Sequence, residues 1–497
     1  MFQRHFYWLP LAAAAGTLAL LASDLPLGIL GEWVWNRSPR LPAIGRWFLP
    51  AVAGFVYIGF VLWGRRRVAA GGMGAVALLL PLLLVAAFLL HAAILDLPDI
   101  GWGVERWPAT LYFPATSGYF TVARTIDDGR AFLAHYETWI QHQDNFHIGT
   151  HPPGLIVIFH SIQRFFEQHP RQASSLVSYL PERFMDGLVQ SAGTKGISIP
   201  EQATLAVVAI LTWVTYLWTI LPIYANARLG ASRENAWLAA AAWPLVPAGP
   251  LFLPVSDCLF PFVSASLVWL MLQSPASRLS LLEFLAGSLL VLGLFVSLAF
   301  LAILPIAIGS RLLHGWRARG TPWRGLIGVI WFAAGTVSAL IWFYWWFDVN
   351  LIAVWRENLA KHAGFYDRMP RTYFPWIGLN LVEFAISTGP IWFVAAFLPF
   401  LLRPWFTIPA SRLGALQCGW WMTMILLDLS GRNLSETARL WILLTPFACT
   451  GLGWYLEEAP GTSKNGDWAL GFWLIAELAV VLALVAGVEP LLPVHAS

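Results

Sequence analysis

Charged residues are scarce in this chain: Asp, Glu, Lys and Arg together make up 11% of its 497 residues, whereas soluble proteins average about 25%. This scarcity excludes an ordinary soluble domain. Several apolar runs are instead long enough, at about 17 to 25 residues, to cross the hydrocarbon core of a bilayer as helices. The composition therefore predicts an all-α polytopic membrane protein embedded in a lipid bilayer.

Three other features are rare or missing. The three cysteines lie in or beside apolar runs, so we expect neither a disulfide framework nor a zinc site. The net charge of +3 is spread over short loops, and we therefore expect no nucleic-acid partner. The sequence contains no glycine-rich phosphate loop, which argues against a cytoplasmic nucleotide-sugar site.

The apolar runs predict about 11 to 13 membrane-spanning helices and a large loop, 96–202, between the third and fourth. The run 281–313 is too long for one crossing, and we interpret it as two short helices. The predicted spans lie near 7–23, 47–64, 73–95, 203–225, 234–250, 254–273, 281–297, 299–313, 323–347, 382–402, 412–429, 437–456 and 468–488.

Arginine clusters predict the orientation, because short cytoplasmic loops are enriched in Lys and Arg. The clusters lie at 65–67, 228–233, 311–324 and 403–412, and residues 37–46 form one exception. The chain is thus predicted to sit in the cytoplasmic (inner) membrane with its N-terminus in the cytoplasm. The extracytoplasmic face would then carry the segments 96–202, 250–254, 348–380 and 430–437.

Two carboxylates, Asp96 and Asp99, follow the third predicted span. Carboxylates beside a bilayer are costly to bury unless they are paired or used. One of them could take a proton from an acceptor hydroxyl as the catalytic base, or the pair could help to hold a divalent cation such as Mg or Mn. The alternative is that both cap the helix end in water.

The loop 96–202 contains an amphipathic stretch, 118–140, which predicts a helix lying along the membrane surface. Two histidines, His147 and His151, follow and are ended by a Pro-Pro-Gly break. Zinc binding would require a third ligand, and none is obvious nearby. The histidines would donate to a phosphate or a sugar hydroxyl, or would make structural hydrogen bonds.

Asp257 opens the predicted span 254–273. A carboxylate in the first turn of a helix complements the helix dipole, which would explain it structurally. The functional alternative is that Asp257 faces a cavity beneath the long loop and contacts the substrate.

The loop 348–380 combines cations with aromatic residues, among them Lys361, His362, Arg371 and Tyr373. Lys and Arg bind phosphate by charge, and Arg also binds it through its planar fork. The pattern favours a site for an anionic, partly apolar ligand. Snorkelling cations in an interfacial loop are the alternative.

The last predicted outside loop carries Arg432, Glu436 and Arg439 at the start of a span. Glu436 and Arg439 are three positions apart and can pair on a helix. The arginines could contact the donor phosphate or sugar while Glu436 orients them, or the pair could be purely structural.

The order of these elements resembles the GT-C superfamily of integral-membrane glycosyltransferases, which includes protein O-mannosyltransferases and lipid A aminoarabinose transferases. The resemblance covers about 73–456, with 1–72 as additional N-terminal spans and 457–497 as a C-terminal span. Its sharpest matches are Asp96-Leu-Pro-Asp99, Thr150-His-Pro-Pro-Gly154 and Pro254-Val-Ser-Asp257.

The resemblance implies that a sugar moves from a polyprenyl-phosphate donor to an extracytoplasmic acceptor, which could be a lipid, a glycan or a protein, by an inverting displacement. It implies that Asp96 or Asp99 activates the acceptor. The superfamily usually has adjacent acidic residues or one intervening residue, whereas two intervene here, so which Asp acts is left open.

Other functions are compatible with the composition. A polytopic transporter or lipid flippase of envelope biogenesis would show helices that are charged or broken at mid-membrane, and internal repeats. A membrane scaffold would leave the loop carboxylates and arginines replaceable. A ligase or polymerase that uses a polyprenyl diphosphate donor would share most of the proposed chemistry.

Overall fold

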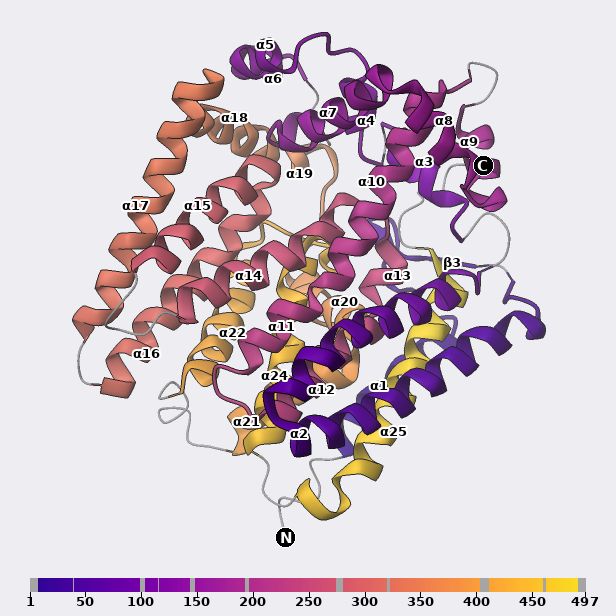
Figure 1. Cartoon of the computed structure of the whole chain (residues 1–497), viewed down its shortest axis with the longest axis vertical. Coiled ribbons are helices and arrows are strands. Elements are labelled where there is room, and N and C mark those ends of the chain that lie inside the picture. The colour runs from indigo at the N-terminus through magenta and orange to yellow at the C-terminus, as the bar shows by residue number, and fades with distance from the viewer. Residues whose placement is uncertain are drawn as a thin grey trace.

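The computed structural model describes residues 8–38, 40–98, 103–114, 116–143, 148–192, 196–273, 280–319, 322–402, 411–458 and 462–489. Helices make up nearly all of the regular structure, as the composition predicted (Figure 1). Two predicted site residues, Asp99 and His147, lie outside the described residues.

The helices of the described chain are α1 (Trp8–Ala22), α2 (Phe48–Leu95), α3 (Arg106–Tyr112), α4 (Tyr119–Ala123), α5 (Gly129–Ala134), α6 (Tyr136–Gln141), α7 (Gly154–Gln168), α8 (Pro170–Ser178), α9 (Glu182–Ala192), α10 (Ile199–Trp218), α11 (Ile220–Ala227), α12 (Arg233–Ala242), α13 (Ala248–Phe252), α14 (Phe260–Gln273), α15 (Ser280–Val296), α16 (Ser310–Arg319), α17 (Pro322–Phe347), α18 (Leu351–Ala363), α19 (Phe365–Arg368), α20 (Tyr373–Thr388), α21 (Pro390–Leu402), α22 (Arg412–Ser430), α23 (Thr437–Leu440), α24 (Thr445–Glu458) and α25 (Thr462–Gly487). The strands are β1 (Gly28–Ile29), β2 (Trp33–Val34), β3 (Asn36–Arg37) and β4 (Val488–Glu489), which pair antiparallel as β1–β2 and β3–β4.

Six described helices are long and apolar enough to cross a membrane, or seven if the bent pair α20–α21 forms one span. On the exposed face of α17, the distance between two tryptophans matches the thickness of a bilayer. Trp323 near its start and Trp345 near its end are 72% and 81% exposed, and they lie about 33 Å apart along a helix. This separation fits aromatic belts at the two interfaces of a hydrocarbon core about 30 Å thick.

The long helix α2 is a hairpin of two helices. Its backbone leaves helical geometry at Gly72 (φ 65°, ψ −148°), which lies beside the Arg233 side chain at the start of α12. Tyr57 precedes Gly72 in the chain and His91 follows it. The Tyr57 hydroxyl donates to the Ala241 carbonyl near the C-terminus of α12, and the His91 ring bonds the Pro244 carbonyl in the turn after α12. The chain therefore reverses near Gly72, as the separate predicted spans 47–64 and 73–95 require.

The predicted division of the run 281–313 is confirmed. Helix α15 ends at Val296, and the extended backbone of Ser297 starts a new turn, with its hydroxyl accepting from the Ala299 N–H at 3.2 Å. Small residues let α15 pack closely against α17: a Cβ at Gly287 or Gly335 would collide with backbone of the facing helix. Close contact through small residues is typical of helix packing in membranes.

The continuous surface helix predicted over 118–140 is wrong. Three short helices, α4, α5 and α6, occupy this stretch, and Figure 1 shows α5 and α6 at one edge of the molecule. The Asp128 carboxylate accepts hydrogen bonds from the N–H groups of Ala131 and Arg130, and these bonds lower its pKa. Asp128 therefore begins a new helix at Gly129 instead of continuing the previous one.

Candidate functional site

Arg439 lies at the centre of the candidate site. Its Nη2 donates to Glu436 Oε2 at 2.7 Å, and electrostatic interactions couple its guanidinium to Asp257 and Tyr119 as well. The side chains of Arg439 and Glu436 are 17% and 20% exposed, so both are mostly shielded yet still reach the surface. We call Tyr119, His151, Asp257, Glu436 and Arg439 the Arg439 cluster.

The backbone that carries Glu436 is strained. Ser435 and Glu436 have φ values of 77° and 55°, a region that side chains other than glycine rarely adopt. Asn380 of α20 fixes this segment, because its Oδ1 accepts from the Ser435 N–H at 3.1 Å and its carbonyl accepts from the Thr437 hydroxyl at 2.9 Å. Backbone strain that the surrounding structure enforces clusters at functional sites.

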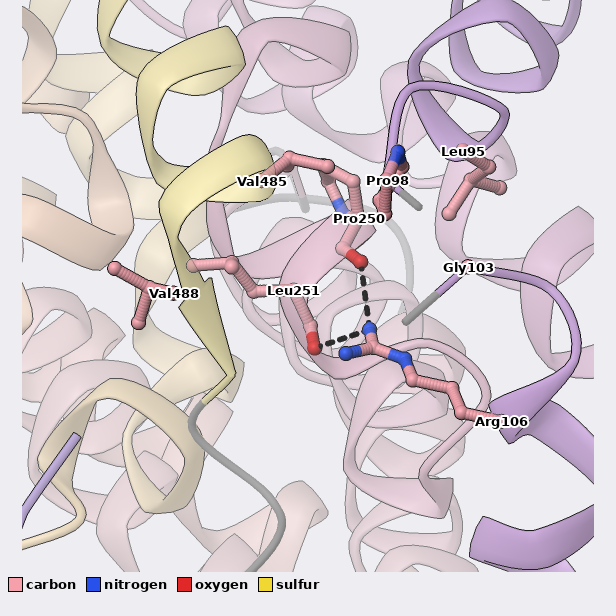
Figure 2. Close-up of a pocket in the computed structure, with 8 residues that line it drawn as sticks. All are labelled: Leu95, Pro98, Gly103, Arg106, Pro250, Leu251, Val485 and Val488. Carbon is pink, nitrogen blue, oxygen red and sulfur yellow. Dashed lines mark hydrogen bonds between the residues drawn. The ribbon is translucent and has the colours of Figure 1, made fainter. Parts of the chain in front are cut away.

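Asp257 reaches the cluster from the 3-10 turn η6 (Ser256–Leu259), just after α13. Arg106 of α3 holds the C-terminal part of α13, where its Nη2 donates to the carbonyls of Pro250 at 3.0 Å and Leu251 at 2.7 Å (Figure 2). The same guanidinium pairs with Glu489 of β4. The long loop and the C-terminal strand thus position the turn that presents Asp257.

Tyr119 and His151 form the side of the cluster that belongs to the long loop. Their rings make an edge-to-face contact with centroids 5.6 Å apart. The Tyr119 side chain is 5% exposed, and its hydroxyl hydrogen-bonds Ser256. Burial and then the neighbouring Asp257 carboxylate raise the pKa of Tyr119 well above its ordinary value, so it stays neutral and can donate a hydrogen bond.

Helix α18 holds the segment that carries His151. The Asn358 amide donates to the carbonyls of Gly149 and His151, both at 3.0 Å, and the Tyr136 hydroxyl donates to the same His151 carbonyl at 2.8 Å. Lys361 donates to two backbone carbonyls at the end of α6 and just after it. The predicted ligand-binding Lys361 is therefore engaged in fixing the loop.

The end of α18 and the short helix α19 face the segment around Arg432. Tyr366 donates from its hydroxyl to the Arg432 carbonyl at 3.1 Å and accepts from the Leu434 N–H at 2.7 Å. Burial, and secondarily the positive charge of Arg432, lower the pKa of His362. The structure thus brings the predicted His362 and Arg432 together, with the imidazole favoured in its neutral form.

Arg371 and Tyr373 also bond the end of α22 and the segment that follows it. Arg371 Nε donates to Ser435 Oγ at 3.1 Å, and the Tyr373 hydroxyl donates to the Leu429 carbonyl at 2.7 Å. Arg371 therefore lies next to the strained backbone, and Tyr373 lies beside the end of α22 that precedes it.

Sequence reasoning missed Glu383, Trp35 and Tyr119. Glu383 of α20 accepts from Trp35 Nε1 at 2.9 Å and from the Thr437 hydroxyl at 3.4 Å, and it interacts electrostatically with Glu436. A lone carboxylate inside an apolar run was the available signal for Glu383, because such residues usually face the protein interior or a functional cavity.

Asp96 has different partners. Its carboxylate pairs with Arg183 and, at 3.7 Å, with Arg46, and its side chain is 56% exposed. Arg183 also pairs with the buried Glu105. The proposed catalytic role of Asp96 stays a prediction, because the contacts of this carboxylate do not show which substrate group it would meet.

A cavity separates the Asp96 region from the turn before Asp257. Figure 2 shows it between the end of α2, with Leu95 and Pro98, and the α13 carbonyls that Arg106 binds. Among the described residues, no group of three or more His, Cys, Asp or Glu is placed to hold a metal ion. Since Asp99 lies outside the described residues, the predicted divalent cation stays a prediction.

The Arg439 cluster combines carboxylates that can accept a hydroxyl proton, a permanent cation that can bind a phosphate, and a neutral phenol that can donate. These groups come from segments far apart in the sequence and meet where several loops converge. Comparison with family models, with curated proteins and with solved structures found no match to this chain.

Proposed function

We propose that the chain is a membrane glycosyltransferase that moves a sugar from a polyprenyl-phosphate donor to an acceptor hydroxyl outside the cytoplasm. One observation carries the proposal: His151, Asp257 and the pair Glu436–Arg439 come from three separate segments and meet around Tyr119 in one cluster. Packing of apolar helices does not require such a group, and a pKa raised by burial and a neighbouring charge, as for Tyr119 beside Asp257, is typical of functional sites.

The proposed mechanism is a single inverting displacement. The acceptor oxygen attacks the anomeric carbon while its proton passes to the Asp257 carboxylate. The bond between that carbon and the phosphate oxygen breaks, and the polyprenyl phosphate leaves with the electron pair. The Arg439 guanidinium stabilises the charge that develops on the phosphate. Asp96 and Asp99 are the alternative bases, as the resemblance implies.

The proposal includes the number of membrane crossings and the orientation of the chain in the membrane. The α2 hairpin would count as two crossings, and the bent pair α20–α21 together with the shorter helices α1, α12, α15, α22 and α24 would bring the number of crossings to about thirteen. The N-terminus would lie in the cytoplasm of a cell with an inner membrane, and the Arg439 cluster would open to the opposite face. A lipid, glycan or protein of the cell envelope would supply the acceptor.

Transfer of radiolabelled sugar tests the proposal. Purified protein in lipid is given a panel of polyprenyl-phosphate sugars, with a membrane extract as the source of acceptor. Asp257→Asn should lower transfer at least about 100-fold, because positioned proton transfer contributes about that much. Asp127→Asn, on a fully exposed side chain, is the matched control and should transfer like wild type.

A transporter or lipid flippase is the second candidate, and one observation favours it. Helices α20 and α21 are bent by 114° at a short break, and broken helices line the binding sites of many transporters. Uptake or scrambling of labelled lipid in sealed vesicles, with no sugar transfer from any donor, would favour this function over glycosyl transfer.

A further inference from the structure

The break between α20 and α21 has a carboxylate inserted into it. The break lies at Gly389, whose φ of 102° suits glycine, and α21 begins at the next residue. Glu477 of α25 accepts a hydrogen bond from the Ile391 N–H at 3.2 Å through Oε2. This bond satisfies one of the backbone donors that a helix N-terminus leaves without a partner.

Glu477 lies near the middle of a membrane-spanning helix. The apolar span of α25 runs from Trp468 to Gly487, and the Glu477 side chain is 0% exposed. Among the described residues, its Oε1 has no hydrogen-bond partner. This oxygen points at the break, because a Cβ built on Gly389 would lie 2.5 Å from it. An ionised carboxylate at this depth is costly.

Within the described part of the chain, no cation interacts with the Glu477 carboxylate. Helices α1, α13 and α21 and the turn η5 (Trp243–Leu245), which all pack on α25, contain no titratable side chain. The titratable groups of the other packed elements are Cys449, Tyr455, Glu457 and Glu458 of α24, Tyr57 and His91 of α2 with Arg65, Arg66 and Arg67 at its hairpin bend, and Glu489 of β4, which pairs with Arg106.

We propose that Glu477 is a proton-binding site in the middle of the membrane, which joins the two halves of the broken helix as a neutral acid. Oε2 accepts from the N-terminus of α21, and the proton would sit on Oε1, which points at the break. Release of this proton would place a negative charge between the positive end of the α21 dipole and the negative end of the α20 dipole. The carboxylate would then be held by α21 and repelled by α20, which favours a change in the angle between the two helices.

The site has a direct structural connection to the Arg439 cluster. Helix α20 runs from the break to Asn380 and Glu383, which bond the backbone and side chains of the segment around Thr437. A change in the angle of α20 would therefore move the segment that carries Glu436 and Arg439. The proton site itself does not depend on the proposed glycosyl transfer.

Infrared spectroscopy of the protein in lipid tests the proposal directly. Wild type should show the carbonyl band of a buried carboxylic acid that persists at a pH well above the ordinary range of glutamate, and Glu477→Gln should lack it. The matched control is Glu283→Gln, because Glu283 pairs with Arg311 inside the bundle, and this variant should keep the band. Identical wild-type and Glu477→Gln spectra in this region would overturn the proposal.

Thermal unfolding followed by tryptophan fluorescence, which the 29 Trp residues permit, provides a second measurement. Glutamine can accept from Ile391 and donate from its amide, so Glu477→Gln should melt close to wild type, whereas Glu477→Ala should melt lower. If Glu477→Gln does not fold, two other measurements replace it. Wild type grown with isotope-labelled glutamate carboxyl groups should show a shifted carboxylic-acid band, and Glu477→Asp should retain a carboxylic-acid band. An unshifted wild-type band would overturn the proposal.

Discussion

Arg439 donates a 2.7 Å hydrogen bond to Glu436, and Glu436 accepts it from a left-handed backbone conformation with φ of 55°. Residues three positions apart in the sequence can also pair in an ordinary helix. Here the helix α23 begins only at Thr437, so the carboxylate is presented from the residue before the helix. This geometry keeps Glu436 and Arg439 together at the junction of the loops.

The strain at Glu436 predicts an unusual order of stabilities. Glu436→Gly should unfold with a free energy about 1 kcal/mol higher than Glu436→Ala, because only glycine adopts this backbone without a steric cost. Both variants lose the carboxylate, so their difference isolates the backbone. Chemical unfolding in detergent micelles measures it, and an alanine variant as stable as the glycine variant would contradict the strained conformation.

The pairing of Arg439 predicts a marked loss of stability when it is removed. Arg439→Ala should lower the free energy of unfolding by about 2 kcal/mol, somewhat less than the loss for a fully buried pair, because the side chains keep some exposure. Arg356→Ala is the control: it breaks a 3.5 Å contact with Glu357 from a side chain that is 76% exposed. That variant should lose less than about 1 kcal/mol.

The pair between Arg106 and Glu489 predicts that the C-terminal strand stabilises the site. Both side chains are buried, at 9% and 1% exposure, so Glu489→Gln should cost about 3 kcal/mol of unfolding free energy. The combined variant Arg106→Met with Glu489→Leu should be less destabilised than Glu489→Gln, since no charge is then left without its partner. Equal stability of Glu489→Gln and wild type would contradict this role.

The lowered pKa of His362 predicts a dependence of stability on pH. Its ordinary pKa is 6.5, and burial together with Arg432 lowers it in the folded state. The unfolded chain therefore binds the proton first as the pH falls, so stability decreases from about pH 6.5 downward and is fully present above it. Melting curves should show a shallower slope for His362→Gln, and a slope equal to wild type would contradict the shift.

Much of the fold could be predicted from hydropathy alone. The helical class, the reversal between residues 64 and 73 and the division of the run 281–313 follow from the length of apolar runs and the thickness of a bilayer. The continuous helix over 118–140 was wrong because Asp128 accepts backbone hydrogen bonds and starts a new helix. A side chain that bonds the backbone in this way competes with the hydrogen bonds of a continuous helix, and the apolar periodicity of the sequence does not reveal this competition.

Arg37, which departs from the positive-inside pattern, has a structural explanation. Its guanidinium donates to the carbonyls of Leu21 at 2.6 Å, Leu25 at 2.7 Å and Leu20 at 3.1 Å. These carbonyls lie at the end of α1 and just after it, where helical carbonyls have no partner along the chain. Arg37 thus caps the C-terminus of α1. Hydropathy and charge counts cannot distinguish an arginine that caps a helix from one that marks a cytoplasmic loop.

The candidate site could be predicted only in part. The polar residues His151, Asp257, Glu436 and Arg439 stand out because they interrupt apolar sequence beside predicted spans. Tyr119 and Glu383 could not be assigned, because their place beside these residues depends on how distant helices pack. Lys361 shows the converse: a cation in a suitable loop is engaged by backbone carbonyls of another segment.

Sugar transfer by Asp257→Asn compared with Asp96→Asn tests the central claim most directly. Each purified variant, checked for wild-type melting, is assayed in lipid with the polyprenyl-phosphate sugar that the wild type uses. We predict that Asp257→Asn loses at least about 100-fold of the transfer rate and that Asp96→Asn retains more activity. Full activity in Asp257→Asn, or no transfer by wild type from any donor of the panel, would contradict the proposed site.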